Sequence, residues 1–199
     1  MTNPQAQKGV DKRGLPIQGL KDGKVTELAM FYTVKPGHEQ AIREAIYGFC
    51  VDPKRDPHLP QIQKALGQIG IHEMRFVLFD KDTRLVWLTS FDSDWDNYID
   101  DTILLVGIPP YTKVLMHTLE GPEGLSEDTP NLGAVVKDLF NAVRITAAGV
   151  LVSNADVSIK EQFRHRDVNR AFETVLNNPD AAEALQHAAL KPLLELAAD

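Results

Sequence analysis

Five aspartates crowd into one short stretch after an apolar run, where their spacing could serve chemistry: Asp92, Asp94, Asp96, Asp100 and Asp101. Alternating carboxylates of this kind open an EF-hand calcium loop, but that loop requires Gly where Asn97 stands and Glu where Ile103 stands. Helix rules account for the cluster instead. Its first acids lie at the expected start of a helix, where Asp92, Ser93 or Asp94 can cap, and the last two fall on the polar face. The cluster is therefore interpreted as helix capping and solvated surface.

The histidines do not complete a familiar catalytic motif. His38-Glu39 and His72-Glu73 resemble the start of a zincin motif, but Ile42 and Phe76 stand where its second histidine belongs. His165-Arg166-Asp167 resembles a kinase catalytic loop, but the required asparagine is replaced by Phe172. Cys50 is the single cysteine, which excludes a disulfide framework and a Cys-based zinc site within one chain. No metal site is predicted.

The remaining candidates lie on expected strands. Side chains alternate between the two faces of a strand, so one face of each strand must line the space between the sheet and its cover. Periodicity leaves open which face that is, and His72 and Arg75 point to opposite faces of one strand. The candidates for the lining are His72, Arg75, Trp87, His117 and Tyr32. His72 or His117 would act as acid or base, and Arg75 would bind an anion or oxyanion. The alternative for each is structural: a hydrogen-bonded histidine, a salt-bridged arginine, a packing aromatic residue.

The elements that must position these residues are predicted from periodicity. Apolar runs predict strands over Leu28–Val34, Met74–Asp80, Arg84–Phe91 and Thr112–Thr118. Apolar residues at helical spacing predict amphipathic helices over residues 39–49 and 95–106, and a short helix is expected near residues 61–66. The order β-α-β-β-α-β predicts an α+β fold with a ferredoxin-like antiparallel sheet, which carries helices on one face. An N-terminal arm (1–25) precedes this unit (26–120).

The remainder of the chain, 121–199, is expected to pack on the same domain as a strand and helices. The spacing predicts a helix over 134–140, a strand over 144–152 and a helix over 158–176. A last helix is expected to open at Pro179 or Asp180. Only one good strand is found here, so this segment is not a second copy of the first unit.

The segments FYTVKPGHEQAIREAI, RFVLFD and RLVWLTSF, followed by a helix, resemble the dimeric α+β barrel superfamily over residues 26–120. The part SFDSDWDNYIDD is most similar to the ferredoxin-like half of its dye-decolourising peroxidase and antibiotic-biosynthesis monooxygenase members. The resemblance implies a cavity and an oxidoreductase or monooxygenase activity. Haem-binding members take an iron ligand from a second ferredoxin-like unit, and only one such unit is expected here. We therefore predict no cofactor and a colourless protein, with haem at His117 as the alternative.

The composition of the chain indicates which classes of binding partner to expect. The chain of 199 residues has a net charge of −7 and no compensating Lys/Arg stripe, which argues against nucleic acid and anionic membrane surfaces. No apolar run is long enough to span a bilayer and the N-terminus has no signal-peptide core, so a cytoplasmic protein is expected. A one-sided sheet leaves an apolar face bare, which predicts a homodimer unless the C-terminal helices cover it. The expected ligand is a small apolar or aromatic molecule, bound by an enzyme or by a non-catalytic module.

Overall fold

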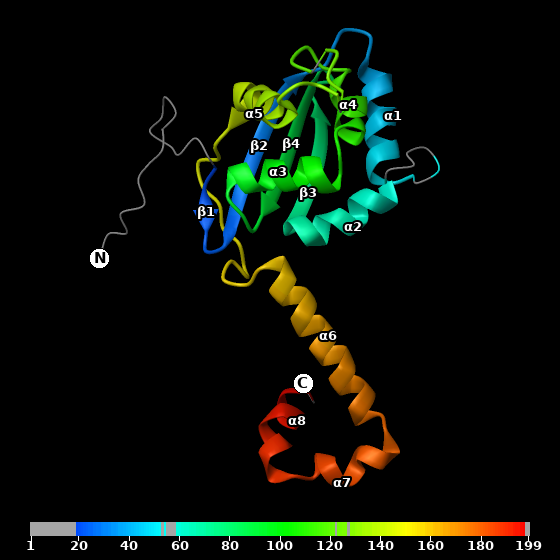
Figure 1. Ribbon diagram of the computed structural model, residues 1–199, viewed down its shortest axis with the longest axis vertical. Helices are drawn as coiled ribbons and strands as arrows, with labels where there is room; N and C mark the ends of the chain where they lie inside the picture. Colours follow the sequence, from blue (N-terminus) through cyan, green and yellow to red (C-terminus); the bar gives the residue numbers. More distant parts are fainter. Residues whose placement is uncertain (1–18, 53, 55–58, 122, 127, 198–199) are drawn as a thin grey trace, which may run out of the picture. The chain divides into compact units, whose positions relative to one another are not determined.

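The computed structural model describes residues 19–52, 54, 59–121, 123–126 and 128–197, which form two compact units that divide after Ile159 (Figure 1). Most of the predicted arm lies outside these residues. The first unit is α+β and contains an antiparallel sheet in the order β1-β2-β4-β3, with β5 beside β2 as well. Its strands are β1 (Lys21–Asp22), β2 (Val25–Thr33), β3 (Ile71–Phe79), β4 (Arg84–Phe91) and β5 (Arg144–Ile145).

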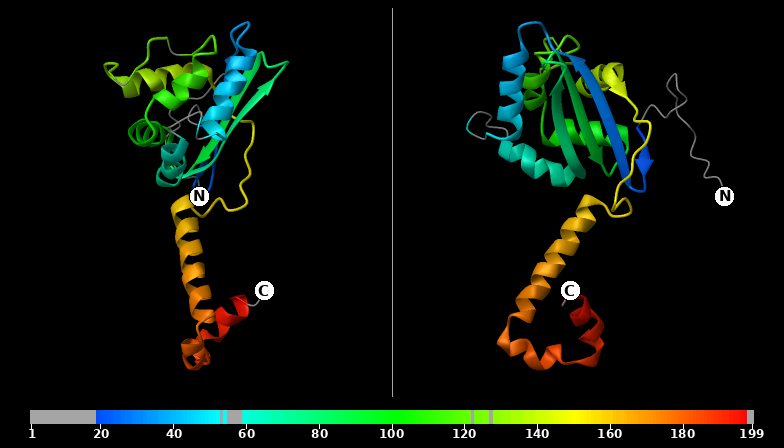
Figure 2. Two further views of the ribbon diagram at one scale, coloured as in Figure 1. Left: turned by 90° about the vertical axis from the view of Figure 1, so that its right-hand side faces the viewer. Right: turned by 180° about the vertical axis from the view of Figure 1, so that it is seen from behind.

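Five helices belong to the same unit and lie on one face of the sheet (Figure 2, left). They are α1 (Glu39–Cys50), α2 (Leu59–Ile69), α3 (Trp95–Leu105), α4 (Pro109–Leu115) and α5 (Leu132–Val143). Seen from behind, no described helix of this unit crosses the other face of the sheet (Figure 2, right). The sheet therefore has a covered face and an open face.

The register shows which residues each face presents. Leu85, Trp87 and Phe91 of β4 are fully or almost fully buried under the helices. On the open face Phe31 of β2 and Val77 of β3 flank Val86, and their exposed fractions are 40% and 42%. The two sets alternate along the same strands, as the pleat requires. Periodicity predicted the two sets but not which of them meets the helices.

Aromatic stacking holds the covered side together. Trp87 stacks on Tyr111 with ring centroids 5.3 Å apart, and Phe140 meets Trp87 edge-on at 5.6 Å. Phe91 and Tyr98 stack at 3.9 Å. These contacts join β4 to α3, α4 and α5, so the core lies between the sheet and these helices.

The predicted strand over Thr112–Thr118 is wrong, because this segment belongs mainly to α4. Pro109 and Pro110 occupy the first turn of that helix, where no intrahelical N–H bond is lost. The two prolines were predicted to end one helix, whereas they start the next. Only Thr118 pairs in a strand-like way, as a single bridge to Val34.

The other elements depart less from prediction. The strand expected over 144–152 is reduced to the two residues of β5. The predicted hairpin between β3 and β4 is confirmed, and its turn places Asp80, Lys81 and Asp82 in the left-handed region. Aspartate tolerates that backbone conformation better than most residues.

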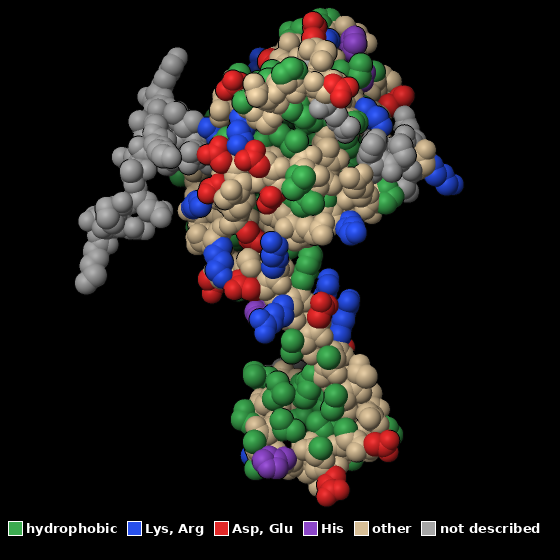
Figure 3. Space-filling view, viewed as in Figure 1, with side chains coloured by type: hydrophobic (Ala, Val, Ile, Leu, Met, Phe, Trp, Pro, Cys, Tyr) green, Lys and Arg blue, Asp and Glu red, His purple; other side chains and the backbone are tan. Residues whose placement is uncertain are grey.

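The second unit is helical. The predicted helix over 158–176 is confirmed as α6 (Ile159–Leu176), whose first residue belongs to the first unit. The expected last helix is instead broken into η1 (Pro179–Ala181), α7 (Ala182–Leu185), η2 (Ala188–Leu190) and α8 (Lys191–Ala197). None of its described residues is buried, and hydrophobic side chains gather on the face seen in Figure 3.

Candidate functional site

A pocket opens on the covered side of the sheet, between β2 and helices α3, α4 and α5. The space that its walls enclose is about 20 Å³, room for roughly one water molecule, so a larger ligand requires wall side chains to move. The wall is mainly apolar, and its side chains include Ile99, Ile103, Ile108, Leu115, Val136 and Phe140. Gly107 lies in the wall with a φ of 80°, which lets the chain turn sharply from α3 into α4. The divergence of these two helices, closed on the other side by α5, creates the pocket.

Five residues with polar side chains interrupt the apolar wall: Tyr32, Thr102, Tyr111, Thr112 and Glu120. Thr102 and Tyr111 are buried. The Tyr111 hydroxyl has no hydrogen-bond partner among the described residues, whereas the Thr102 hydroxyl is next to that of Tyr98. Burial raises the pKa of Tyr98 to about 12, and the Thr102 hydroxyl acts to lower it. The Tyr32 hydroxyl lies 3.5 Å from Met30 Sδ. At the mouth, Glu120 Oε2 accepts a hydrogen bond of 2.7 Å from the Thr33 amide.

Burial keeps both pocket tyrosines neutral. It raises the pKa of Tyr32 far above that of a free phenol, and the negative charge of Glu120 adds to the effect. Burial also raises the pKa of Tyr111 well above its ordinary value. Both phenols therefore remain protonated at physiological pH and can donate a hydrogen bond.

Of the two residues predicted to line the cavity, Tyr32 lies in the pocket wall. Trp87 lies behind it, 1% exposed, and contacts two wall residues, the rings of Tyr111 and Phe140. The indole Nε1 of Trp87 has no hydrogen-bond partner among the described residues. Trp87 thus supports the wall rather than forming it.

His72 lies at a bulge near the start of β3, where the register shifts between Ile71 and Glu73. A bulge re-aims the extra side chain. Here the Nε2 of His72 lies 2.6 Å from Asp92 Oδ1, and Asp92 Oδ2 accepts a hydrogen bond of 2.7 Å from the Ile159 amide. The pair therefore joins β3, the end of β4 and the first residue of α6.

His117 follows α4 at the opposite end of the sheet, next to the bridge between Val34 and Thr118. Its Nδ1 lies 3.0 Å from the Nδ1 of His38, which precedes α1. Burial lowers the pKa of His117, and the nearby His38 and Lys35 lower it further. These effects favour the neutral form of the His117 imidazole.

Arg75 lies on the open face of β3, where its NH2 pairs with Glu73 Oε1 at 3.2 Å. The three residues predicted to act together are thus at three places: one end of the sheet, the other end and the open face. The structure does not bring His72, Arg75 and His117 into one site. None of them lines the pocket.

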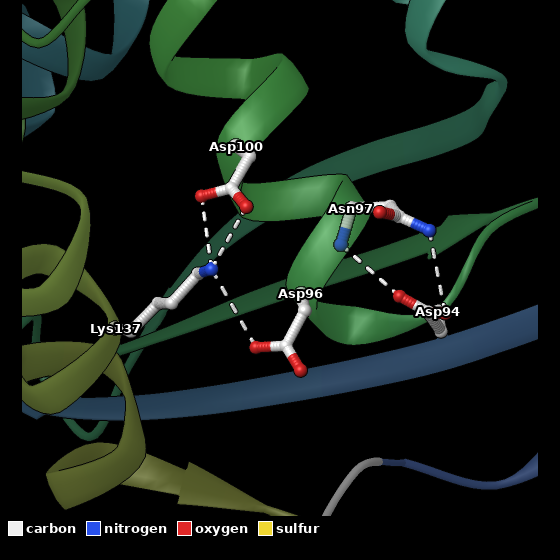
Figure 4. Close-up of polar contacts among 5 residues, drawn as sticks. All are labelled: Asp94, Asp96, Asn97, Asp100 and Lys137. Atoms are coloured by element: carbon white, nitrogen blue, oxygen red, sulfur yellow. Dashed lines mark hydrogen bonds and ion pairs between the residues drawn. The ribbon is translucent and has the colours of Figure 1, made fainter.

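Asp94, Asp96 and Asp100 follow the prediction of capping and polar surface, whereas Asp92 does not, because its side chain is 15% exposed and pairs with His72. Asp94 is the N-cap of α3, and its carboxylate accepts a hydrogen bond from the Asn97 amide at 3.0 Å (Figure 4). Lys137 of α5 lies 2.9 Å from Asp100 and 3.5 Å from Asp96. The capping interpretation is confirmed, and the polar face also holds α5 against α3. No group of three His, Cys, Asp or Glu among the described residues could hold a metal ion.

Sequence reasoning missed Thr102 and Tyr111 as site residues. Thr102 falls on the apolar stripe of α3, and a hydroxyl at such a position is a signal that could have been used. Tyr111 stood between the two prolines and the predicted strand over Thr112–Thr118, in no predicted element, so its side chain could not be placed. The remaining wall residues look like ordinary core positions, because a pocket wall and a core have the same composition.

Among the described residues, no helix is long and apolar enough to cross a membrane. Three kinds of feature in this α+β chain could serve a function. They are the pocket, the pairs His72–Asp92 and His38–His117, and the open face of the sheet. Comparisons of the chain with protein-family models, curated proteins and solved structures found no match.

Proposed function

We propose that this protein binds a small, mainly apolar molecule in the pocket between β2 and α3–α5. The observation that carries the proposal is a mainly apolar wall next to the buried hydroxyl of Tyr111, which has no hydrogen-bond partner among the described residues. Ligand sites combine apolar walls with a few placed polar groups in this way. Buried polar groups in a purely structural core are normally hydrogen-bonded.

The same geometry favours binding over catalysis. The two tyrosines are neutral phenols, and Glu120 is at the mouth rather than inside. The predicted acid or base residues, His72 and His117, contact Asp92 and His38 instead. An oxidoreductase or monooxygenase activity is the alternative. It is tested by a turnover assay with a substrate that native mass spectrometry identifies in the purified protein.

The pocket can be tested with toluene as a probe, followed through the methyl resonances of the wall residues. Saturable shifts of Ile99 and Ile103 are expected. Val136→Phe places a larger side chain in the wall and should abolish them. Val135→Phe is the matched control, because Val135 is the neighbouring position of α5 and does not line the pocket. Equal shifts in both variants would contradict the proposal.

The pocket does not fit haem. None of the described wall residues is a histidine, cysteine or methionine, and a neutral phenol is a poor iron ligand. Titration with hemin should therefore give no sharp, saturable one-to-one Soret shift. A one-to-one shift that is lost in His117→Ala would reverse this conclusion.

The open face of the sheet is proposed to bind a second copy of the chain. Phe31, Val77 and Phe79 are 38–42% exposed there, on strands whose other face is packed. The order β5-β2-β4-β3, with each neighbouring pair antiparallel, supports a ferredoxin-like unit of the dimeric α+β barrel type in which β5 replaces the predicted fourth strand.

Light scattering at micromolar concentration tests the dimer, with an expected mass twice the 22.1 kDa of the chain. Val77→Lys should give a monomer, because it buries a charge in the proposed interface. Leu104→Lys is the control, since Leu104 is exposed on α3 at the covered side. A monomeric parent protein would favour cover of the open face within one chain.

A further inference from the structure

The second unit, residues 160–197, has no core of its own. None of these described residues is buried. Several of its large apolar side chains are instead exposed: Phe163, Val168, Val175, Leu176, Leu193 and Leu196. An isolated helix is marginal in water, and the burial of apolar area is what offsets the conformational entropy of a folded chain. The unit therefore requires another surface to cover these side chains.

Apolar residues form a seam along one side of α6. Val168, Phe172 and Val175 are separated by four and three residues, the spacing at which helices pack in pairs. A groove beside this seam lies between α6 and α8, and its lining includes Val168, Phe172, Leu193, Arg164 and His165. Figure 3 shows hydrophobic side chains gathered on one face of this unit. The seam is thus a surface for packing against another helix, with cationic side chains beside it.

The charges of the second unit are separated along the chain. Residues 160–170 have an excess of cations, since they include Lys160, Arg164, Arg166 and Arg170 against Glu161 and Asp167. Residues 171–183 include Glu173, Asp180 and Glu183 and no Lys or Arg. Within the part of the chain that the structure describes, Lys160 and Arg164 have no ion-pair partner. The two segments therefore attract each other's counterparts, and each repels its own.

We infer that the second unit binds the second unit of another copy of this chain, with the two α6 helices antiparallel about a two-fold axis. An antiparallel pair brings residues 160–170 of one copy to residues 171–183 of the other, so opposite charges meet at both ends of the contact. A two-fold interface uses the same surface on both copies, so each charge contact occurs twice. An acidic partner of another kind would match the first segment and be repelled by the second.

This contact joins the same two chains as the proposed dimer, on which the inference rests and which it strengthens. It does not depend on the pocket. The open face of the sheet and the second unit can therefore be tested separately, because substitutions in one leave the surface of the other unchanged.

Two variants with complementary charges test the contact. Arg164→Glu/Arg170→Glu makes residues 160–170 acidic, and Glu173→Lys/Glu183→Lys makes residues 171–183 basic. Either variant alone brings like charges together at both ends of an antiparallel pair, so the dissociation constant of its dimer should rise by roughly tenfold or more. An equimolar mixture of the two variants pairs opposite charges again and should return the constant to near the parental value.

Sedimentation equilibrium over a concentration series measures each dissociation constant, and circular dichroism checks that the helix content is kept. All four substituted side chains are exposed, so their replacement removes no packing. Lys54→Glu/Lys64→Glu is the matched control, because both lysines are exposed in the first unit and the net charge changes as much as in Arg164→Glu/Arg170→Glu. The control should keep the parental dissociation constant.

Weaker dimers of both variants, with association restored in their mixture, support the inference. Parental dissociation constants in every variant would show that the second unit is outside the interface, so the inference would be wrong while the dimer through the open face stands. Weaker dimers without restoration in the mixture would show that the second unit contacts some other surface, which also contradicts the inference. A parent protein that is monomeric at every concentration contradicts both the inference and the proposed dimer.

Discussion

The two faces of the sheet carry similar side chains and have opposite environments. On the covered face, Trp87 and Phe91 are at most 1% exposed under the helices. On the open face, Phe31 and Phe79 are 40% and 38% exposed, although they belong to β2 and β3 of the same sheet. The difference shows that apolar character alone does not decide burial, because a side chain is buried only where another layer covers it. The open face also carries the charged pair Arg75–Glu73, so it is less uniformly apolar than the covered face.

The largest expected effect on stability is a difference between substitutions on the two faces of the sheet. Trp87→Ala removes an indole that contacts Phe76, Tyr111 and Phe140, and should lower the free energy of unfolding by about 3–5 kcal/mol. Phe31→Ala on the open face should cost less than about 1 kcal/mol if that face is solvated. Urea denaturation of both variants measures the difference. A cost at Phe31 close to that at Trp87 would indicate that the open face is covered in solution.

A smaller effect is expected at the start of α3, one of the covering helices. Asp94→Ala removes the cap that accepts from the Asn97 amide, which should cost about 1 kcal/mol. Asp101→Ala is a suitable control, because Asp101 is on the same helix and does not cap it. Equal losses in the two variants, measured by thermal unfolding, would show that general charge rather than capping is responsible.

The contact of α5 with α3 should contribute less to the free energy of unfolding than the cap at Asp94. Lys137 bridges Asp96 and Asp100, but both carboxylates are about 60% exposed, so solvent screens the pairs. Lys137→Met keeps the aliphatic stem and should lower the free energy of unfolding by less than about 1 kcal/mol. The loss should shrink further in 0.5 M salt. A loss that is large and independent of salt would contradict an electrostatic role.

The smallest effect on stability at neutral pH is expected for substitution of His117, because its imidazole is mainly neutral at that pH in both the folded and the unfolded chain. Its pKa is lowered in the folded state, so the unfolded chain takes up a proton first as the pH falls below 6.5. Stability should therefore decrease from pH 6.5 down to the lowered pKa, and His117→Asn should remove part of that decrease. Lys35→Met should remove a smaller part, since the Lys35 charge is the last of the three causes. Denaturant titrations across this pH range measure the slope, and an unchanged slope in His117→Asn would contradict the assignment.

The sequence determined the local elements of the first unit well. The strands β2, β3 and β4 and the helices α1, α3 and α5 follow from alternation and helical spacing, and Asp94 caps as the order of acids predicts. These features depend on neighbours within a few residues, which a single sequence contains. The same holds for the α+β class.

Only the tertiary structure decided which set of side chains is covered and where the pocket lies. Pro109 and Pro110 are compatible with the end of one helix or the start of another, and the buried positions Tyr111, Val114 and Leu115 settle the choice through contacts with distant elements. His72 and His117 were predicted as alternative acid or base residues of one cavity, yet a bulge and a helix place them at opposite ends of the sheet. Thr102 and Tyr111 meet in one wall because α3 and α4 diverge. Such encounters depend on packing between elements far apart in the chain, and no local pattern encodes them.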